Sequence, residues 1–284
     1  MKTLLLLFIS TYLLATISEP IHSSLSTYYE NKTYTGSFQK KDADTYGIGA
    51  DLHYKKSEYK LLYEYSHANT KQPPLKTDLK NHKIFFRYAH NFTNNITLNF
   101  NYLSVLSDNI AITDGGDGYA AGLSYRVTKK LLTNFTQYYI AYKDFNTYQS
   151  DFRIDYKSKF NTLGIKISSI SKYINIDEKH KNSFTKNAQK DYFTSGIKLH
   201  MHYNTYHCGA GAYFGKRAFA VMNDGFKIQH HAMEFDKTYA IGVGKTLSNF
   251  ILRIQYIYQR ATELPVKNDG VEIDTIRIIL NYKF

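Results

Sequence analysis

Apolar and polar residues alternate one by one along almost the whole chain, from about residue 26 to the last residue. One stretch shows the pattern clearly, with apolar side chains at every second position: Tyr46, Ile48, Ala50, Leu52 and Tyr54. Because successive side chains of a β-strand point to opposite faces, a period of two predicts strands with one dry face and one wet face. The chain is therefore expected to be all-β.

Runs of this kind predict fourteen strands, near residues 26–36, 45–55, 59–67, 83–92, 96–104, 118–127, 131–143, 147–157, 161–170, 192–203, 206–215, 238–245, 250–260 and 274–284. Their connections alternate between short turns and mostly longer loops, with 144–146 the one short link where a long one is expected. An even number of antiparallel strands, with short turns at one end and longer loops at the other, is typical of a transmembrane up-and-down β-barrel. In such barrels the short turns are periplasmic and the longer loops extracellular.

A soluble β-sandwich or a lipocalin-like barrel would also alternate, with its dry face turned inward. The chain has 27 Tyr and 18 Phe, and many of these rings flank the expected turns, as Tyr54, Tyr59 and Phe92 do. A ring with a polar tip is most stable at the level of the lipid headgroups, where barrels carry aromatic girdles. The aromatic excess and the loop asymmetry therefore favour lipid around the strands.

The first residues predict a secretory signal peptide. Lys2 precedes an apolar stretch from Leu4 to Leu14, and Thr16 and Ser18 supply small residues before a plausible cleavage site. A buried helix or a short membrane anchor is the alternative, but about 14 apolar residues are too few to span a bilayer. We expect residues 1–18 to be a cleaved signal peptide and residues 19–284 to form a single barrel domain.

The C-terminal residues alternate up to the last one, with apolar side chains at Ile276, Ile278, Leu280, Tyr282 and Phe284. This ending resembles the C-terminal signal by which outer-membrane proteins of Gram-negative bacteria are recognised for barrel assembly. With the signal peptide and the strand pattern, the resemblance covers effectively the whole chain. It implies that Leu280, Tyr282 and Phe284 are the assembly signal, that the barrel-assembly and periplasmic chaperone machinery are partners, and that the location is the outer membrane.

Size and strand count resemble the monomeric fourteen-stranded porins. The closing run IRIILNYKF and the paired opening strands also resemble OprD-like porins, although that family is longer and has more strands.

The formal net charge of +12 would suit nucleic acid, anionic lipid or acidic solutes. The alternation places much of this charge on the wet faces of the strands, which would line the lumen and leave nucleic acid improbable. The expected pore-lining residues are Lys60, Glu64, Arg87, Arg126, Asp151, Arg153, Asp155, Lys166, Lys198, Arg253 and Arg277. Basic groups outnumber acidic ones, which predicts a preference for anions. The alternative is that the mixed charges only solvate and brace the wall.

Histidines gather around one expected turn, at His200, His202 and His207. With a two-residue turn at Asn204 and Thr205, His202 should face His207 across the strands and point into the lumen. Cross-strand histidines can bind Zn²⁺ or Cu²⁺, but no Cys or carboxylate on these two strands completes a ligand set. Cys208 is expected on the lipid face, so a polar lining near the rim is the favoured interpretation, with no metal and no cofactor.

No motif fixes a nucleophile, a base and an orienting group together, so the chain is not expected to be an enzyme. The pattern favours an outer-membrane porin for passive diffusion of small hydrophilic solutes, surrounded by outer-membrane lipid and lipopolysaccharide. The alternative is a narrow or plugged barrel that acts as a surface enzyme, an adhesin or a structural anchor. A loop folded into the lumen, at 171–191 or 216–237, would point to the alternative.

Overall fold

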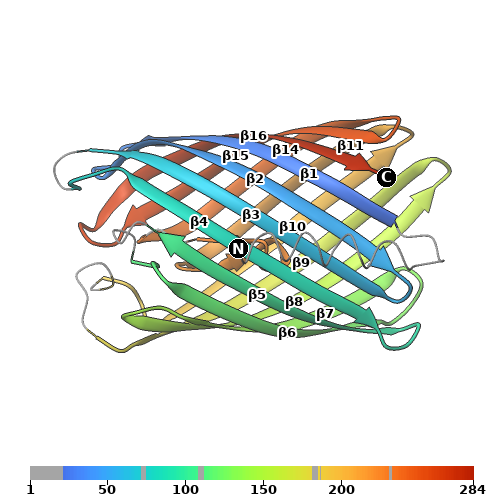
Figure 1. The fold of residues 1–284 in the computed structure, drawn as a ribbon, viewed down its shortest axis with the longest axis horizontal. Coiled ribbons are helices and arrows are strands. Elements are labelled where there is room, and N and C mark those ends of the chain that lie inside the picture. The colour runs from blue at the N-terminus through green and yellow to red at the C-terminus, as the bar shows by residue number, and fades with distance from the viewer. Residues whose placement is uncertain (1–21, 72–74, 108–111, 181–184, 186, 230–231) are drawn as a thin grey trace, which may run out of the picture.

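The computed structural model describes residues 22–71, 75–107, 112–180, 185, 187–229 and 232–284, which form a closed antiparallel barrel of fourteen strands (Figure 1). The barrel strands are β1 (His22–Thr35), β2 (Lys40–Tyr54), β3 (Ser57–Thr70), β4 (Leu79–Asn91), β5 (Ile96–Ser107), β6 (Gly116–Arg126), β7 (Leu131–Ala141), β8 (Phe145–Phe160), β9 (Leu163–Glu178), β10 (Asp191–Tyr203), β11 (Tyr206–Arg217), β14 (Met233–Leu247), β15 (Phe250–Glu263) and β16 (Asn268–Lys283). Between β11 and β14 lie β12 (Val221–Met222), the 3₁₀ turn η1 (Asn223–Gly225) and β13 (Lys227–Ile228), which form a separate two-stranded sheet.

Each barrel strand pairs with its neighbours in the chain, and the ring closes where β1 pairs with β16. The predicted all-β, fourteen-stranded, up-and-down barrel is thus confirmed. β1 has a poor apolar outward face, with Thr27, Asn31 and Thr33, yet it pairs along its length with both β2 and β16. Closure explains this, because a strand that completes the ring satisfies backbone hydrogen bonds on both of its edges.

The strands run further toward the loop end than the sequence pattern indicates. β2 begins at Lys40 and β9 continues to Glu178, so the loops expected at 37–44 and 171–191 are shorter than predicted. Backbone pairing does not need an apolar side chain, and the polar ends of these strands stay in the ladder where the alternation fades. The expected signal peptide, residues 1–18, lies outside the described residues.

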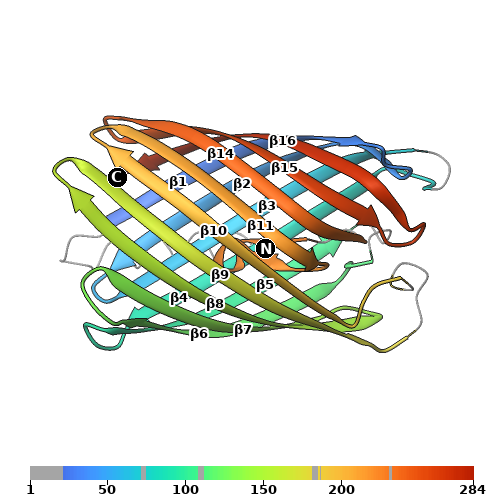
Figure 2. The ribbon, with the colours of Figure 1, turned by 180° about the vertical axis from the view of Figure 1, so that it is seen from behind.

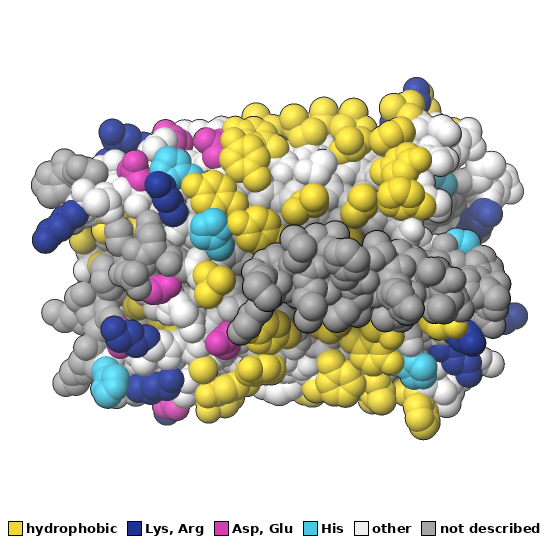
Figure 3. Space-filling model, viewed as in Figure 1, with side chains coloured by type: hydrophobic (Ala, Val, Ile, Leu, Met, Phe, Trp, Pro, Cys, Tyr) yellow, Lys and Arg dark blue, Asp and Glu magenta, His cyan; other side chains and the backbone are white. Residues whose placement is uncertain are grey.

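Aromatic rings form two belts on the outward face. Toward the loop end, neighbouring strands bring together Tyr29 and Tyr46, with ring centroids 5.2 Å apart, and Tyr102 and Tyr119, 5.4 Å apart. Toward the short turns, Phe250 and Tyr282 lie 4.7 Å apart. Figure 3 shows hydrophobic side chains over the middle of the barrel and most charged side chains toward its two ends. This is the distribution expected of an outward face that contacts lipid.

Tyrosine hydroxyls mark the loop-end border of this apolar band. Tyr102 donates to Asp117 at 2.9 Å, and Tyr173 donates to Asp191 at 2.6 Å, in each case across a hairpin from the strand before a loop to the strand after it. The ring remains over the apolar band while its hydroxyl reaches a charged residue beyond it. The outward face thus carries charged residues at the ends of its strands, beyond the apolar band.

The interior contains an apolar cluster among polar and charged side chains. At the loop end, Phe85, Leu103, Ile140, Phe145 and Ile174 pack inside the barrel as one buried cluster on the side of β4 to β9.

No helix in the described part of the chain is long and apolar enough to cross a membrane.

A charge on the outward face should be more harmful than the same charge in the lumen. Ile241 is exposed near the middle of β14, whereas Gln255, at the level of its neighbour Gly242, lines the lumen. Ile241→Arg should lower the free energy of unfolding in phospholipid bilayers by about 2–4 kcal/mol, because the guanidinium would lie in hydrocarbon. Gln255→Arg is the control and should cost much less in the same urea titration. Equal costs would mean that the outward face does not contact lipid.

Candidate functional site: the lumen and its inserted segment

The connection between β11 and β14 folds back into the barrel, and we call residues 218–229 the inserted segment. Figures 1 and 2 show it inside the ring of strands from both sides. Ala218, Phe219, Ala220 and Val221 are completely buried, and Phe219 packs on Phe145 with ring centroids 4.7 Å apart. These apolar residues complete the buried cluster of the interior, so the burial of apolar surface holds the segment inside.

A backbone irregularity precedes the segment. The pairing of β11 with β14 shifts register between Phe214 and Arg217, and Gly215 lies there with a φ of +94°. A Cβ at this glycine would approach the carbonyl oxygen of Phe193 to 2.5 Å. Glycine is therefore required for the bulge from which the chain turns inward.

Side chains of β8 and β9 bind the backbone of the inserted segment. The Gln149 amide accepts from the Val221 N–H and donates to the Val221 carbonyl, both at 2.8 Å, and Lys172 donates to the same carbonyl at 3.0 Å. Asp151 accepts from Gln149 at 2.7 Å and forms an ion pair with Lys172. These polar groups are buried and mutually paired, so they fix Val221 in position as a strand partner would.

Ion pairs attach the tip of the segment to two walls. Asp224 forms a bidentate pair with Arg153 of β8, and Lys227 donates to both carboxylate oxygens of Glu30 on β1, at 2.7 and 2.9 Å. In the ring order, seven steps separate β1 from β8 in either direction, so these two anchors lie on opposite walls. The inserted segment therefore crosses the lumen.

The charges around the tip keep it ionised. Burial raises the pKa of the Asp224 carboxyl. The adjacent Arg153, together with Arg87 and Lys198, lowers it by more, so that the pKa falls to about 2. A carboxyl group with a lowered pKa stays charged at neutral pH and loses its pairing only as the pH falls toward that value. The Asp224–Arg153 pair is thus intact over the physiological range.

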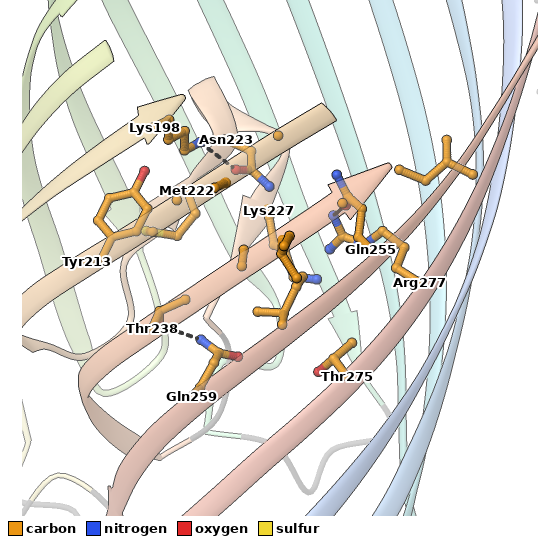
Figure 4. A pocket seen from close by; sticks show the side chains of 18 of the residues that line it. Lys198, Tyr213, Met222, Asn223, Lys227, Thr238, Gln255, Gln259, Thr275 and Arg277 are labelled. Carbon is orange, nitrogen blue, oxygen red and sulfur yellow. Dashed lines mark hydrogen bonds between the residues drawn. The ribbon is translucent and has the colours of Figure 1, made fainter. Parts of the chain in front are cut away.

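A cavity of about 450 Å³ lies beside the inserted segment, mainly against β10, β11, β14, β15 and β16, and reaches residues of β1, β3 and β4. Figure 4 shows Lys227 of the segment, Gln255 of β15 and Arg277 of β16 reaching into it, with Lys198 bonded to Asn223 at its edge. We call it the glycine-lined cavity, because five of its lining positions on β11 and β14 carry only hydrogen or methyl side chains: Gly209, Gly211, Ala240, Gly242 and Gly244. Gly209 faces Gly242 and Gly211 faces Ala240 across the two strands, so the hollow exists where the wall has no side chains.

The glycine-lined cavity is elongated along the barrel. Its lining extends from His207, Gly244 and Arg253 near the short turns to Phe235 and Ile273 near the loop end. A second cavity, of about 360 Å³, lies against residues of β1 to β4 and β16 that include Asp51, Lys60 and Arg87. Asn223 and Lys227 of the segment line both cavities.

Most of the expected pore-lining charges lie in the lumen, and many are paired. Lys60 pairs with Glu58 at 2.8 Å, and Lys166 pairs with Asp155 at 3.0 Å. Further pairs join Glu64 with Lys83, Asp151 with Lys172, Arg153 with Asp224 and Arg277 with Glu30. In the described residues, Arg87, Lys198 and Arg253 have no carboxylate partner, and Arg126 is exposed at the end of β6 beside a short turn.

Several lumen residues were missed by the sequence analysis: Glu30, Lys32, Lys83, Lys172, Arg217, Asp224 and Lys227. Glu30 belongs to the strand with the weakest pattern, and the strand ends that carry Lys172 and Arg217 continue past the predicted limits. One signal was present in the sequence. The run Ala218-Phe219-Ala220-Val221-Met222 is too apolar for a loop in water, and its apolar character indicates burial.

The histidine register is as predicted. His202 faces His207 and Met201 faces Cys208 across the turn between β10 and β11. The ring of His207 lies 4.7 Å from that of His202 and 6.0 Å from that of His200, measured between centroids. Across residues 22–284, apart from the segments left undescribed, no group of three or more His, Cys, Asp or Glu side chains is placed to hold a metal ion.

Comparison with known proteins identifies the fold. No family model matches the sequence, and no curated protein matches it. The toluene transporter TbuX of Ralstonia pickettii superposes with a TM-score of 0.57 at 10% identity, over 94% of this chain and 90% of that one. A bacterial polysaccharide outer-membrane secretin gives 0.56 at 8% identity, over 92% and 98%, and the porin NanC gives 0.50 at 12% identity, over 91% and 100%. At these identities the likeness shows the fold alone, which is that of outer-membrane β-barrel porins and transporters.

Loss of the Gln149 side chain should loosen the inserted segment without unfolding the barrel. Gln149→Ala removes two hydrogen bonds to Val221, each worth about 1 kcal/mol net, so amide exchange within residues 219–228 should be about tenfold faster or more. Hydrogen-exchange mass spectrometry measures this directly. Gln255→Ala is the matched control, because Gln255 contacts Arg277 and not the backbone of the segment. An unchanged exchange rate in Gln149→Ala would contradict the role given to this amide.

Proposed function

We propose that the chain is a channel of the Gram-negative outer membrane, through which small hydrophilic solutes diffuse passively and anions pass more readily than cations. The observation that carries the proposal is the glycine-lined cavity, which extends through much of the barrel and is lined by Lys198 and Arg253, two cations without a carboxylate partner. The barrel fold and the apolar outward face support a location among outer-membrane lipid and lipopolysaccharide.

The physical basis of the anion preference is the unpaired charge, not the total charge. Paired groups such as Lys166 and Asp155 present little net field to a solute, whereas Lys198, Arg253 and Arg87 act through a narrow, low-dielectric lumen. Such groups lower the barrier for anions and raise it for cations. The preference should therefore be moderate and should weaken at high salt.

The inserted segment sets the width of the path. It packs on the buried apolar cluster and leaves the glycine-lined cavity and the second cavity beside it. A barrel narrowed in this way should conduct weakly and should select solutes by size. We further propose that Leu280, Tyr282 and Phe284, on the outward face of β16 and at its end, act as the recognition signal for barrel assembly after transit with periplasmic chaperones.

The same segment supports a second candidate function. Because it crosses the lumen and is held at both walls, the barrel could be closed at rest and act as a surface enzyme, an adhesin or a structural anchor. A closed barrel gives no current. Conductance therefore separates the two functions.

Refolded protein in planar lipid bilayers should show steady single-channel steps with an anion-selective reversal potential in a KCl gradient. Replacing both unpaired cations of the glycine-lined cavity, as Lys198→Gln with Arg253→Gln, should shift the reversal potential toward zero. Arg126→Gln, at the exposed end of β6, is the control and should change it little. Cation selectivity of the native protein would refute the anion preference, and silent bilayers would support the closed-barrel alternative.

Filling the glycine-lined cavity should reduce conductance several-fold. Gly211→Leu places a side chain in the cavity, and its Cβ would lie 3.4 Å from Cγ of Lys198, an ordinary contact that the barrel can accept. Gly164→Leu is the matched control, at a β9 position outside both cavities. If the two variants conduct alike, the path does not follow the β11–β14 wall.

A further inference from the structure

We propose that the short-turn end of the glycine-lined cavity is a binding site for an oxyanion, the carboxylate or phosphate group of a solute, held between His207 and Arg253 above Gly244. This inference rests on the proposed channel function only for the route by which the anion arrives. The binding itself can be measured without conduction.

The register of four neighbouring strands builds the site. His202 of β10 faces His207 of β11, His207 faces Gly244 of β14, and Gly244 faces Arg253 of β15. Because Gly244 has no side chain, none stands between the imidazole of His207 and Arg253. A Cβ at Gly244 would lie 2.7 Å from Cγ of Arg253, so the stem of Arg253 lies across this glycine. His207, Gly244 and Arg253 all line the same cavity.

Two polar atoms at this place lack partners. His207 Nε2 is hydrogen-bonded to the Thr246 hydroxyl at 2.8 Å, but His207 Nδ1 is buried and unbonded. Arg253 Nε is also buried and unbonded, and among the described residues Arg253 has no carboxylate partner. Buried polar groups without a partner keep their hydrogen-bonding capacity for a ligand. Both groups can donate to an anion when the imidazole is protonated or in the suitable tautomer.

The charged groups that face this end of the lumen are basic on every strand around it. They are Lys166 on β9, His200 and His202 on β10, His207 on β11, Arg253 on β15 and Lys283 on β16. Asp155 also lies nearby, but it is occupied by Lys166 at 3.0 Å. The site therefore combines a positive potential with unpaired donors, which is the arrangement that binds carboxylate and phosphate groups in proteins.

A metal ion is the other ligand that histidines at this place could bind. Zn²⁺ and Cu²⁺ favour sets of three or four imidazole, thiolate or carboxylate ligands, and a cationic guanidinium beside the site opposes them. Cys208 lies next to His207 in the chain and so points to the opposite face of β11. The two ligand classes also respond to pH in opposite directions. Anion binding strengthens as an imidazole gains a proton at lower pH, whereas metal binding requires the neutral ring.

The test uses the full-length mature protein in detergent micelles, with imidazole resonances followed by NMR. Inorganic phosphate and acetate are titrated separately at constant ionic strength, so that the two oxyanion classes are distinguished. We expect a saturable shift of the His207 resonance with at least one of them, and tighter binding at pH 6 than at pH 8. Arg253→Gln should weaken binding tenfold or more, Arg253→Lys should restore part of it, and Arg126→Gln should leave it unchanged.

Each result has a defined meaning. If neither anion gives a saturable shift in folded protein, or if Arg253→Gln binds like the native chain, the inference is wrong. Tight Zn²⁺ binding that strengthens from pH 6 to pH 8, without anion binding, would assign the histidines to a metal instead. Saturable anion binding in a barrel that shows no conductance would overturn the channel proposal alone, and conductance without binding would overturn this inference alone.

Discussion

The structure depends on one constraint: every backbone donor and acceptor of a strand in a lipid environment must be paired within the protein. Closure of β1 on β16 satisfies it, and once the ring is closed the alternation of side chains sends every second residue outward and every other one into the lumen. The outward rings and the inward charges are thus two results of the same pairing.

The position of the inserted segment has a second cause, which is the burial of its apolar side chains inside the barrel. A fourteen-stranded ring is too wide for its inward side chains to fill it, and at the loop end β4 to β9 carry a cluster of apolar inward side chains. Phe219 and Val221 cover them, and Gln149, Arg153 and Glu30 satisfy the polar groups that the segment brings in. On the other side, the glycines of β11 and β14 leave the space that the segment does not occupy. The lumen is therefore partly filled by the inserted segment and partly open along the glycine-lined wall.

Local pattern predicted the strands, the short turns and the facing of His202 and His207, because all of these follow from a period of two and from turn length. It could not predict the inserted segment, whose contacts join residues far apart in the chain: Gln149 and Val221 are 72 positions apart, and Glu30 and Lys227 are 197 apart. For the same reason the sequence overstated the free charge of the wall. Arg153 and Arg277 were expected to face solute, but their carboxylate partners, Asp224 and Glu30, lie on the segment and on the strand with the weakest pattern.

The central claim is that solutes pass along the glycine-lined wall and not through the buried apolar cluster. The most direct test is substituted-cysteine accessibility in bilayers, in a Cys208→Ala background. Gly211→Cys should be modified by an anionic, membrane-impermeant thiol reagent and should then conduct less, whereas Ala120→Cys, within the buried cluster, should be unaffected. Block through Ala120→Cys with no effect at Gly211→Cys would contradict the account.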